Sequence, residues 1–278
     1  MPRRTAYGPG TPCWVDHITV DLTGAKQFYG GLFGWEFTRE NDRGYHLITL
    51  RGEIIGGLGP SPMGMAPGSS WNVYLASKDL DHTRTEVGRL GGRVVMGPVP
   101  AGGDGRLCLA VDPSGAAVGF WEGGRDEGVV LVDEPGALCA CELHTARPDA
   151  AEEFYRGLYG DVPAVIRSSS RTGWVPFFGI GDAENTESSG GSGSDEGSAA
   201  EVSTGNAGDE ETGQGTGNSG STTTETAAGN AEGPGGTGIT GITGITVAAA
   251  LAAGARQLDS GLFADPLGGV FGLTGGNY

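Results

Sequence analysis

The chain has 278 residues, a formal net charge of −17, a hydrophobic content of 37% and 55 glycines. This length suits two domains, and the acidic balance argues against nucleic acid and anionic membranes as partners. The sequence contains no apolar run of about 18 residues, so no membrane span is predicted, and no apolar segment follows the basic start as a signal peptide requires. The four cysteines form no CxxC pattern, which favours free thiols and a cytoplasmic location.

Residues 1–12 are expected to be a flexible lead-in, and residues 13–124 to form a first, complete domain of two similar units. Alternating and helical apolar patterns give each unit one strand, one helix and three further strands. The first unit is predicted over residues 14–21, 23–33, 35–39, 45–50 and 53–58. The second is predicted over residues 71–76, 80–90, 93–96, 106–111 and 116–121.

The first domain is echoed in the second half of the chain. Residues 28–34 (FYGGLFG) return as residues 154–160 (FYRGLYG), each at the end of a predicted helix. Three more segments, 71–75, 91–93 and 112–115, return in the same order as 174–178, 254–256 and 265–268. Such self-similarity indicates a repeat architecture. The spacings indicate two deletions and one long insertion in a degenerate second domain, residues 138–278.

The insertion spans residues 183–240 and contains neither Lys nor Arg. It is rich in Gly, Ser, Thr and acidic residues, so it buries too little apolar surface to offset its chain entropy and is predicted to be disordered. It could recruit a basic partner or serve only as a solubilising loop; composition favours the loop.

The paired βαβββ units, the FYxxLFG helix end and the DPxG before the last strand resemble the vicinal oxygen chelate superfamily. This superfamily includes glyoxalase I, bleomycin resistance proteins and extradiol dioxygenases, and the chain looks most like its duplicated, four-unit members. The resemblance implies an α+β fold of tandem βαβββ units in half-open barrels, with the second copy truncated. It also implies a concave face that holds a small molecule, while one such scaffold hosts many chemistries.

Metal-dependent members of this family take His, Gln or Glu ligands from the first and last strands of their units. The corresponding positions here are Trp14, Gly119, Ala140 and Gly272, with the remaining positions of the first domain near 56–57 and 71–72. Glycine, alanine and tryptophan side chains cannot ligate a divalent ion, so no metal and no other cofactor are expected. His17 lies on the opposite strand face from Trp14 and Asp16 and is expected to be a surface or packing histidine, unless a shorter connection to the helix changes the register.

Strand parity directs Trp14, Asp16 and Trp121 towards the concave face, a lining suited to a flat or bulky organic molecule. Asp16 could act as a general acid or base, or could hold the rim through hydrogen bonds. Parity does not decide whether Tyr45 or His46 faces inward. The same question is open for Asn72 and Tyr74. Arg106 could bind a carboxylate or cap a loop. The candidate ligand-binding residues are Trp14, Asp16, Tyr45, Asn72, Tyr74, Arg106 and Trp121.

Glu142 and His144 share one face of a strand in the second half and could form an acid–base pair. The alternative is that the second domain only covers or stabilises the first. The candidate catalytic residues are therefore Asp16, His46, Glu142 and His144.

Three functions are compatible with these patterns. The first is metal-free binding or sequestration of a small, largely apolar or aromatic compound, as in the antibiotic-binding members of the family. The second is a metal-independent isomerase, cyclase, lyase or hydrolase that uses acid–base chemistry on a small metabolite. The third is an interaction protein that uses the acidic insertion. The sequence leaves open whether the four units assemble within one chain or pair between chains in a homodimer.

Overall fold

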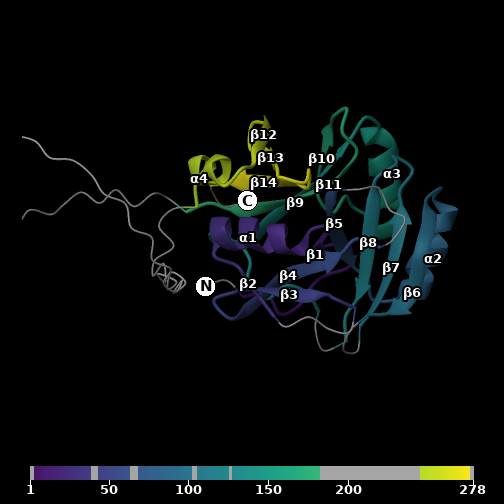
Figure 1. Cartoon of the computed structure of the whole chain (residues 1–278). Coiled ribbons are helices and arrows are strands. Elements are labelled where there is room, and N and C mark those ends of the chain that lie inside the picture. The colour runs from purple at the N-terminus through teal and green to yellow at the C-terminus, as the bar shows by residue number, and fades with distance from the viewer. Residues whose placement is uncertain are drawn as a thin grey trace, which may run out of the picture. The chain divides into compact units, whose positions relative to one another are not determined.

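The computed structural model describes residues 3–38, 43–62, 68–101, 105–124, 127–181 and 245–275 (Figure 1). The predicted insertion, residues 183–240, lies outside these ranges, so its disorder and any role in recruiting a partner stay predictions. No helix of the described ranges is long and apolar enough to cross a membrane.

The first half of the chain forms one mixed sheet of eight strands, in the order β2-β3-β4-β1-β5-β8-β7-β6. Its first unit consists of β1 (Pro12–Thr19), α1 (Leu22–Phe33), β2 (Glu36–Phe37), β3 (His46–Leu50) and β4 (Glu53–Pro60). Its second unit consists of β5 (Ser69–Ala76), α2 (Leu80–Arg89), β6 (Arg93–Pro100), β7 (Arg106–Val111) and β8 (Ala117–Glu122). The first strands of the two units, β1 and β5, are antiparallel neighbours in the middle of the sheet.

The second half forms a six-stranded sheet in the order β10-β9-β11-β14-β13-β12. Its third unit keeps only β9 (Leu138–Thr145), α3 (Pro148–Tyr159) and β10 (Val165–Ser168). Its fourth unit is complete, with β11 (Gly173–Gly179), α4 (Val247–Ala252), β12 (Arg256–Asp259), β13 (Leu262–Ala264) and β14 (Val270–Thr274). The predicted α+β class with tandem βαβββ units and a shorter second copy is confirmed, and neither sheet closes into a barrel.

Local sequence explains where the two longest helices begin and end. The Asp21 carboxylate accepts a hydrogen bond from the Gly24 amide and so caps α1, while Pro148 fills the first turn of α3. Both helices end at a glycine in the left-handed conformation, Gly34 with φ 69° and Gly160 with φ 82°. These are the glycines of the repeated FYxxLxG motif.

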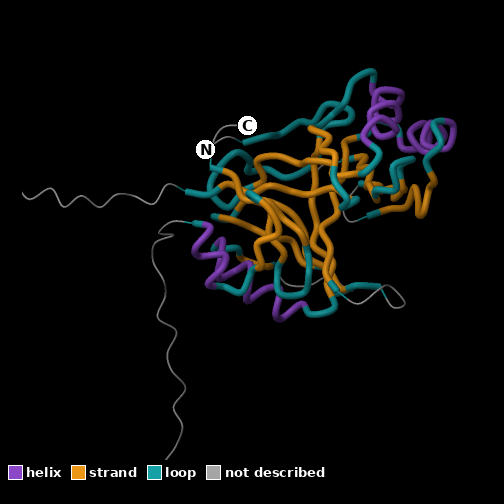
Figure 2. Tube along the Cα trace, turned by 90° about the horizontal axis from the view of Figure 1, so that it is seen from above, coloured by secondary structure: helices purple, strands orange, loops and turns teal. Residues whose placement is uncertain are grey.

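One hydrophobic core joins the two halves. Phe33 of α1 stacks near Trp35 and also contacts Phe178 of β11 and Phe271 of β14. In both ribbon views the helices form two groups on opposite sides of the strands, α1 with α4 and α2 with α3 (Figures 1 and 2). The first unit therefore meets the fourth, and the second meets the third.

Two equivalent hydrogen-bond clusters stabilise these contacts between units. We call these clusters the first and second joint. In the first joint, Tyr29 donates from Oη to Asp265 Oδ2 at 2.9 Å and accepts from Trp71 Nε1 at 2.9 Å. In the second joint, Tyr155 donates to Asp112 Oδ2 at 3.0 Å and accepts from Trp174 Nε1 at 3.1 Å. Each half thus supplies a Tyr–Trp pair to one joint and an Asp to the other, and all six residues belong to the repeated motifs.

Only the first joint contains a histidine. His17, 1% exposed, contacts Asp265 through Nε2 and Oδ2 at 2.7 Å, whereas Leu143 occupies the corresponding position of β9. Burial acts to raise the pKa of Asp265, but the hydrogen bond and charge of His17, with smaller contributions from Gly269 and Tyr29, outweigh it and hold that pKa below its usual value. His17 is therefore a core residue of the joint, on the opposite face of β1 from Asp16.

Candidate functional site

Asp16 lies at the centre of a hydrogen-bonded cluster on β1. Its Oδ1 accepts from Asn72 Nδ2 at 2.8 Å, and its Oδ2 accepts from Tyr74 Oη at 3.0 Å and from Tyr45 Oη at 3.3 Å. Trp14 Nε1 in turn donates to Tyr45 Oη at 3.1 Å. Five of the seven predicted ligand-binding residues are thus brought together around one carboxylate.

The structure resolves the choice between the adjacent residues Tyr45 and His46. Tyr45 points to Asp16, while His46 lies on the other side, where Nε2 is 2.9 Å from Lys26 Nζ and Nδ1 is 2.6 Å from the Thr38 carbonyl oxygen. Because an ammonium group only donates, Nε2 is the accepting nitrogen and Nδ1 carries the proton. The predicted catalytic candidate His46 therefore does not lie at the Asp16 cluster.

The Asp16 carboxylate is 5% exposed. Burial raises the pKa of Asp16 above its usual value, although its three hydrogen bonds and the His17 ring oppose this shift. Burial and the Asp16 charge also raise the pKa values of Tyr45 and Tyr74 well above the usual value for tyrosine, so both hydroxyls stay protonated as donors.

Strand register places the aromatic side chains on the same face as Asp16, which we call the Asp16 face. Trp14 pairs with Tyr74, Tyr74 with Gly119, and Gly119 with Leu109, so one row crosses four strands. Trp14 and Trp121 are half-buried and pack with Tyr74 in a small hydrophobic cluster. The predicted aromatic lining is therefore assembled from strands of both units.

Sequence reasoning missed one member of this cluster, Tyr7. It packs against the cluster, and its hydroxyl donates to the Val129 carbonyl oxygen at 2.6 Å. Arg4 N also donates to the Val130 carbonyl oxygen. The segment expected to be a flexible lead-in carries these contacts, and no local pattern around Tyr7 indicates them.

The residues at this face do not fit a bound divalent metal. A Cβ atom at Gly57 would overlap the Tyr45 hydroxyl, and one at Gly119 would overlap the Tyr74 ring. Tyrosine side chains therefore fill the space into which a ligating side chain would project. Phenol and amide groups around one carboxylate make a poor donor set for such an ion, and no three His, Cys, Asp or Glu residues gather into a metal site within the described ranges.

Arg106 lies apart from Asp16 and is engaged by acidic side chains. Its guanidinium contacts Glu122 at 3.0 and 3.1 Å and Asp81 at 3.1 Å, and Glu122 also accepts from the Leu80 amide. Arg106 thus ties β7 and β8 to the start of α2. Of the two roles predicted for it, these contacts match a structural cap.

The second half has its own version of the site. Glu142 stands on β9 where Asp16 stands on β1, and Arg167 of β10 donates to both its oxygens at 2.9 and 3.2 Å. His144 Nε2 lies 3.3 Å from Glu142 Oε2, so the predicted pair is in contact. Burial lowers the pKa of His144, with Arg167 and Arg171 adding to this effect and Glu142 opposing it. Arg167 is a partner that sequence reasoning missed.

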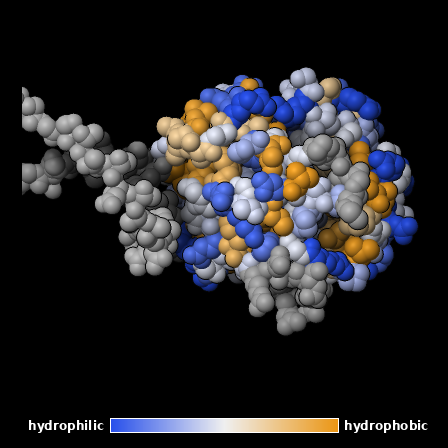
Figure 3. Space-filling view, viewed as in Figure 1, coloured by the Kyte–Doolittle hydropathy of each residue, from blue (hydrophilic) through white to orange (hydrophobic). Residues whose placement is uncertain are grey.

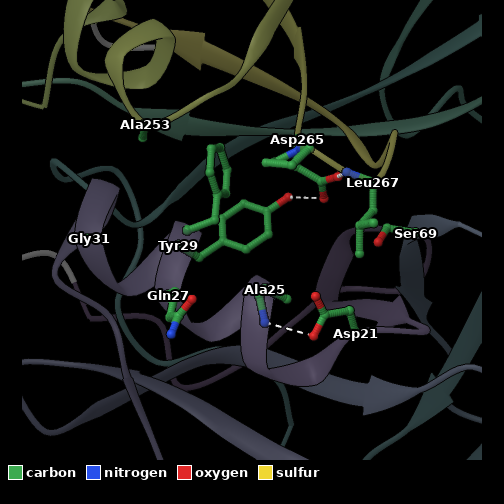
Figure 4. A pocket seen from close by; sticks show the side chains of 12 residues that line it. Asp21, Ala25, Gln27, Tyr29, Gly31, Ser69, Ala253, Asp265 and Leu267 are labelled. Atoms are coloured by element: carbon green, nitrogen blue, oxygen red, sulfur yellow. Dashed lines mark hydrogen bonds between the residues drawn. The ribbon is translucent and has the colours of Figure 1, made fainter.

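A cavity of about 400 Å³ lies elsewhere, between α1, the end of α4 and the loop 265–267 (Figure 4). Phe28, Ala253 and Leu267 give it a largely apolar lining. Asp265 also borders it, but Oδ2 is held by the first joint and Oδ1 accepts from the amides of Leu267 and Gly269. The neighbouring helix α4 exposes Val247 and Leu251, and its apolar surface is visible at the upper left of Figure 3. None of the predicted site residues borders this cavity.

Comparison with known proteins gives consistent results. A profile of the "Glyoxalase/Bleomycin resistance protein/Dioxygenase superfamily" matches residues 14–120. "Putative glyoxylase CFP32" of Mycobacterium tuberculosis is 41% identical over 166 residues, which cover 58% of this chain and 64% of the relative. "Anthracycline biosynthesis protein DnrV" of Streptomyces peucetius is 32% identical over 194 residues, covering 64% of this chain and 70% of the relative.

The matched region thus spans less than two thirds of the mycobacterial relative. Among solved structures, the Mn(II)-bound glyoxalase of Novosphingobium aromaticivorans is similar with a TM-score of 0.41 and 18% identity, covering 54% of this chain and 53% of the glyoxalase.

Proposed function

The chain belongs to the glyoxalase, bleomycin resistance protein and dioxygenase superfamily, and from this premise we propose that its Asp16 face is a metal-free binding site for a small, flat, largely apolar organic molecule. The observation that carries the proposal is the cluster itself: a buried carboxylate held by neutral donors, with half-buried tryptophans beside it. Aromatic side chains around a few fixed polar groups are typical of small-molecule sites.

The names of the relatives support this class of ligand. DnrV and the related DauV are both named as anthracycline biosynthesis proteins. Anthracyclines are planar polycyclic compounds, the shape that stacking surfaces such as Trp14 and Trp121 accept. We therefore propose a polycyclic aromatic or similarly flat compound.

The positions of the five tryptophans allow a direct test. Trp14 and Trp121 lie at the Asp16 face, while Trp35, Trp71 and Trp174 are buried in the common core. In a titration of ¹⁵N-labelled protein with 9-anthracenemethanol, followed by ¹H–¹⁵N correlation spectra, the indole signals of Trp14 and Trp121 are expected to shift because an aromatic ligand changes the field of nearby protons.

The variants Trp14→Phe and Trp121→Phe assign these two signals and should each weaken binding. The three core tryptophans serve as internal controls. Shifts confined to Trp35, Trp71 and Trp174, or no shifts at the solubility limit of the probe, would contradict the proposed site.

A second candidate function rests on the raised pKa of Asp16. Burial raises the pKa of Asp16, which makes this carboxylate a stronger proton acceptor than an ordinary one, as a metal-independent acid–base enzyme requires. The distinguishing measurement is deuterium exchange at the acidic C–H groups of 2-tetralone in D₂O. Exchange at the buffer rate in the presence of the protein, or no loss of rate in Asp16→Asn, would remove this candidate.

A further inference from the structure

The charges around Asp16 define which ligands the Asp16 face can accept. The described groups that act on this carboxylate are Asn72, Tyr74 and Tyr45, which are neutral donors, and the His17 ring, which lies on the opposite face of β1 and contacts Asp265. Arg106 of β7, the strand that pairs with β8, is held by Glu122 and Asp81. Within the described ranges, therefore, no Lys or Arg neutralises Asp16.

Glu142 provides the contrast within the same molecule. It occupies the corresponding position of β9, but Arg167 contacts both of its oxygens and His144 lies beside it. A buried carboxylate is stabilised by a paired cation because its own desolvation is costly. Glu142 has such a cation from its own chain, whereas Asp16 has hydroxyl and amide donors instead.

The aromatic side chains add a second attraction for positive charge. Trp14, Trp121, Tyr45 and Tyr74 lie on or beside the Asp16 face, and the faces of such rings attract cations, Trp most strongly. The Tyr74 hydroxyl donates to Asp16 and its oxygen can also accept a hydrogen bond, whereas the Tyr45 oxygen already accepts from Trp14 Nε1. An ammonium group can thus donate to the Tyr74 oxygen while the Tyr74 hydroxyl still donates to Asp16.

We propose that the Asp16 face selects aromatic ligands that carry a protonated amine, with Asp16 as the counter-charge and the Tyr74 hydroxyl oxygen as the group that accepts from the ammonium. This inference rests on the proposed binding function and narrows its ligand class. The site is thereby distinguished from the Glu142 site, whose charge is already balanced by Arg167.

A matched series of three probes tests the charge preference. The probes 9-anthracenemethylamine, 9-anthracenemethanol and 9-anthracenecarboxylate share one ring system and are cationic, neutral and anionic at pH 7. Isothermal titration of the full chain at low salt should give an affinity for the amine about tenfold higher than for the alcohol, with the carboxylate weakest.

Asp16→Asn should remove most of the amine's advantage over the alcohol, whatever its effect on the affinity for the alcohol itself. Tyr74→Phe provides a second variant if Asp16→Asn does not fold, and it should reduce the amine's advantage without removing the aromatic surface. Glu152→Gln, which removes one exposed acidic charge on α3, is the matched control and should leave the advantage intact.

The outcomes separate the two proposals. Failure of all three probes to bind would overturn the binding function and this inference with it. Equal affinities for amine and alcohol in the wild-type protein would overturn only the charge preference. An advantage that survives both Asp16→Asn and Tyr74→Phe would also overturn it, because the preference would then arise from the overall acidic charge of the chain.

Discussion

Asp16 and Glu142 stand at matching positions of two related sheets, yet their surroundings differ. Asn72 pairs with Asp16 across the sheet where Val175 pairs with Glu142. Tyr74 lies over Gly119 where Phe177 lies over Gly272. One copy thus surrounds its carboxylate with neutral hydroxyl and amide donors, while the other replaces those residues with apolar ones and brings in Arg167. The comparison teaches that both copies of the scaffold hold a buried acid at this position, and that the groups that satisfy this acid can differ between the copies.

The joints show a milder version of the same divergence. Both retain the Tyr–Asp–Trp hydrogen bonds, but only the first adds His17. Contacts that hold the halves together have therefore changed less than the two carboxylate sites.

The largest expected effect tests whether Glu142 depends on its cation. Among the described residues, Arg167→Met leaves His144 as the side chain in contact with the buried Glu142. We expect the free energy of unfolding to fall by about 3 kcal/mol, at the low end for a broken buried pair because the Arg167 side chain is 53% exposed. Urea denaturation measures this. Arg156→Met, which breaks an exposed pair with Glu152, is the control and should cost less than about 0.5 kcal/mol. Similar losses of unfolding free energy in both variants would show that Glu142 does not depend on its cation, and would contradict the contrast drawn with Asp16.

Substitutions in the two joints are expected to have an intermediate effect on the free energy of unfolding. Tyr155→Phe leaves Trp174 Nε1 and Asp112 Oδ2 without the hydroxyl, and should lower the free energy of unfolding by about 2 kcal/mol. Tyr29→Phe should cost about 1 kcal/mol, because His17 still contacts Asp265 Oδ2.

The same denaturation series measures the difference between the joints. Adding His17→Leu to Tyr29→Phe should bring the first joint's loss up to that of the second. If the two single variants cost the same, His17 does not account for any difference between the joints.

The last expected effect concerns Asp16 and pH, and its size depends on how far the pKa of Asp16 is raised. Because its pKa is raised in the folded state, the native protein holds this proton more tightly than the unfolded chain does. The stabilising contribution of Asp16 is therefore fully present below the unfolded pKa and is lost as pH rises through the folded pKa. Asp16→Asn should gain stability relative to wild type as pH rises from the unfolded pKa through the folded pKa, by about 1.4 kcal/mol per unit of difference between the two pKa values. A stability difference that does not change with pH would show that the neutral donors offset the burial of the Asp16 charge as fully as Arg167 offsets that of Glu142.

Much of this organisation could be predicted from the sequence. The helix ends follow from glycines and caps, and strand parity alone put Trp14 and Asp16 on one face with His17 on the other. Parity could not predict which of Tyr45 and His46 faces Asp16, because the turn before β3 determines which residues of that strand point to each side of the sheet. Nor could it indicate that Tyr45 and Tyr74 fill the space above Gly57 and Gly119.

The partners of charged residues were the least predictable features. Arg106 is bound by Asp81 and Glu122, which come from different elements and meet only through tertiary packing. Arg167 reaches Glu142 through the parallel register of β10 on β9, which depends on how the shortened third unit pairs. The Asp16 cluster was more accessible because its members lie on neighbouring strands of one sheet.

The reciprocal arrangement of the joints has a consequence for how such a chain can diversify. Each half contains both a tyrosine donor and an aspartate acceptor, so two copies of one ancestral half would bond to each other twice around a twofold axis, as in a symmetric dimer. Covalent fusion makes that pairing permanent and removes the need for both copies to remain identical. One copy can then lose strands, gain an insertion and pair its buried acid with an arginine, while the other keeps its buried acid among neutral donors.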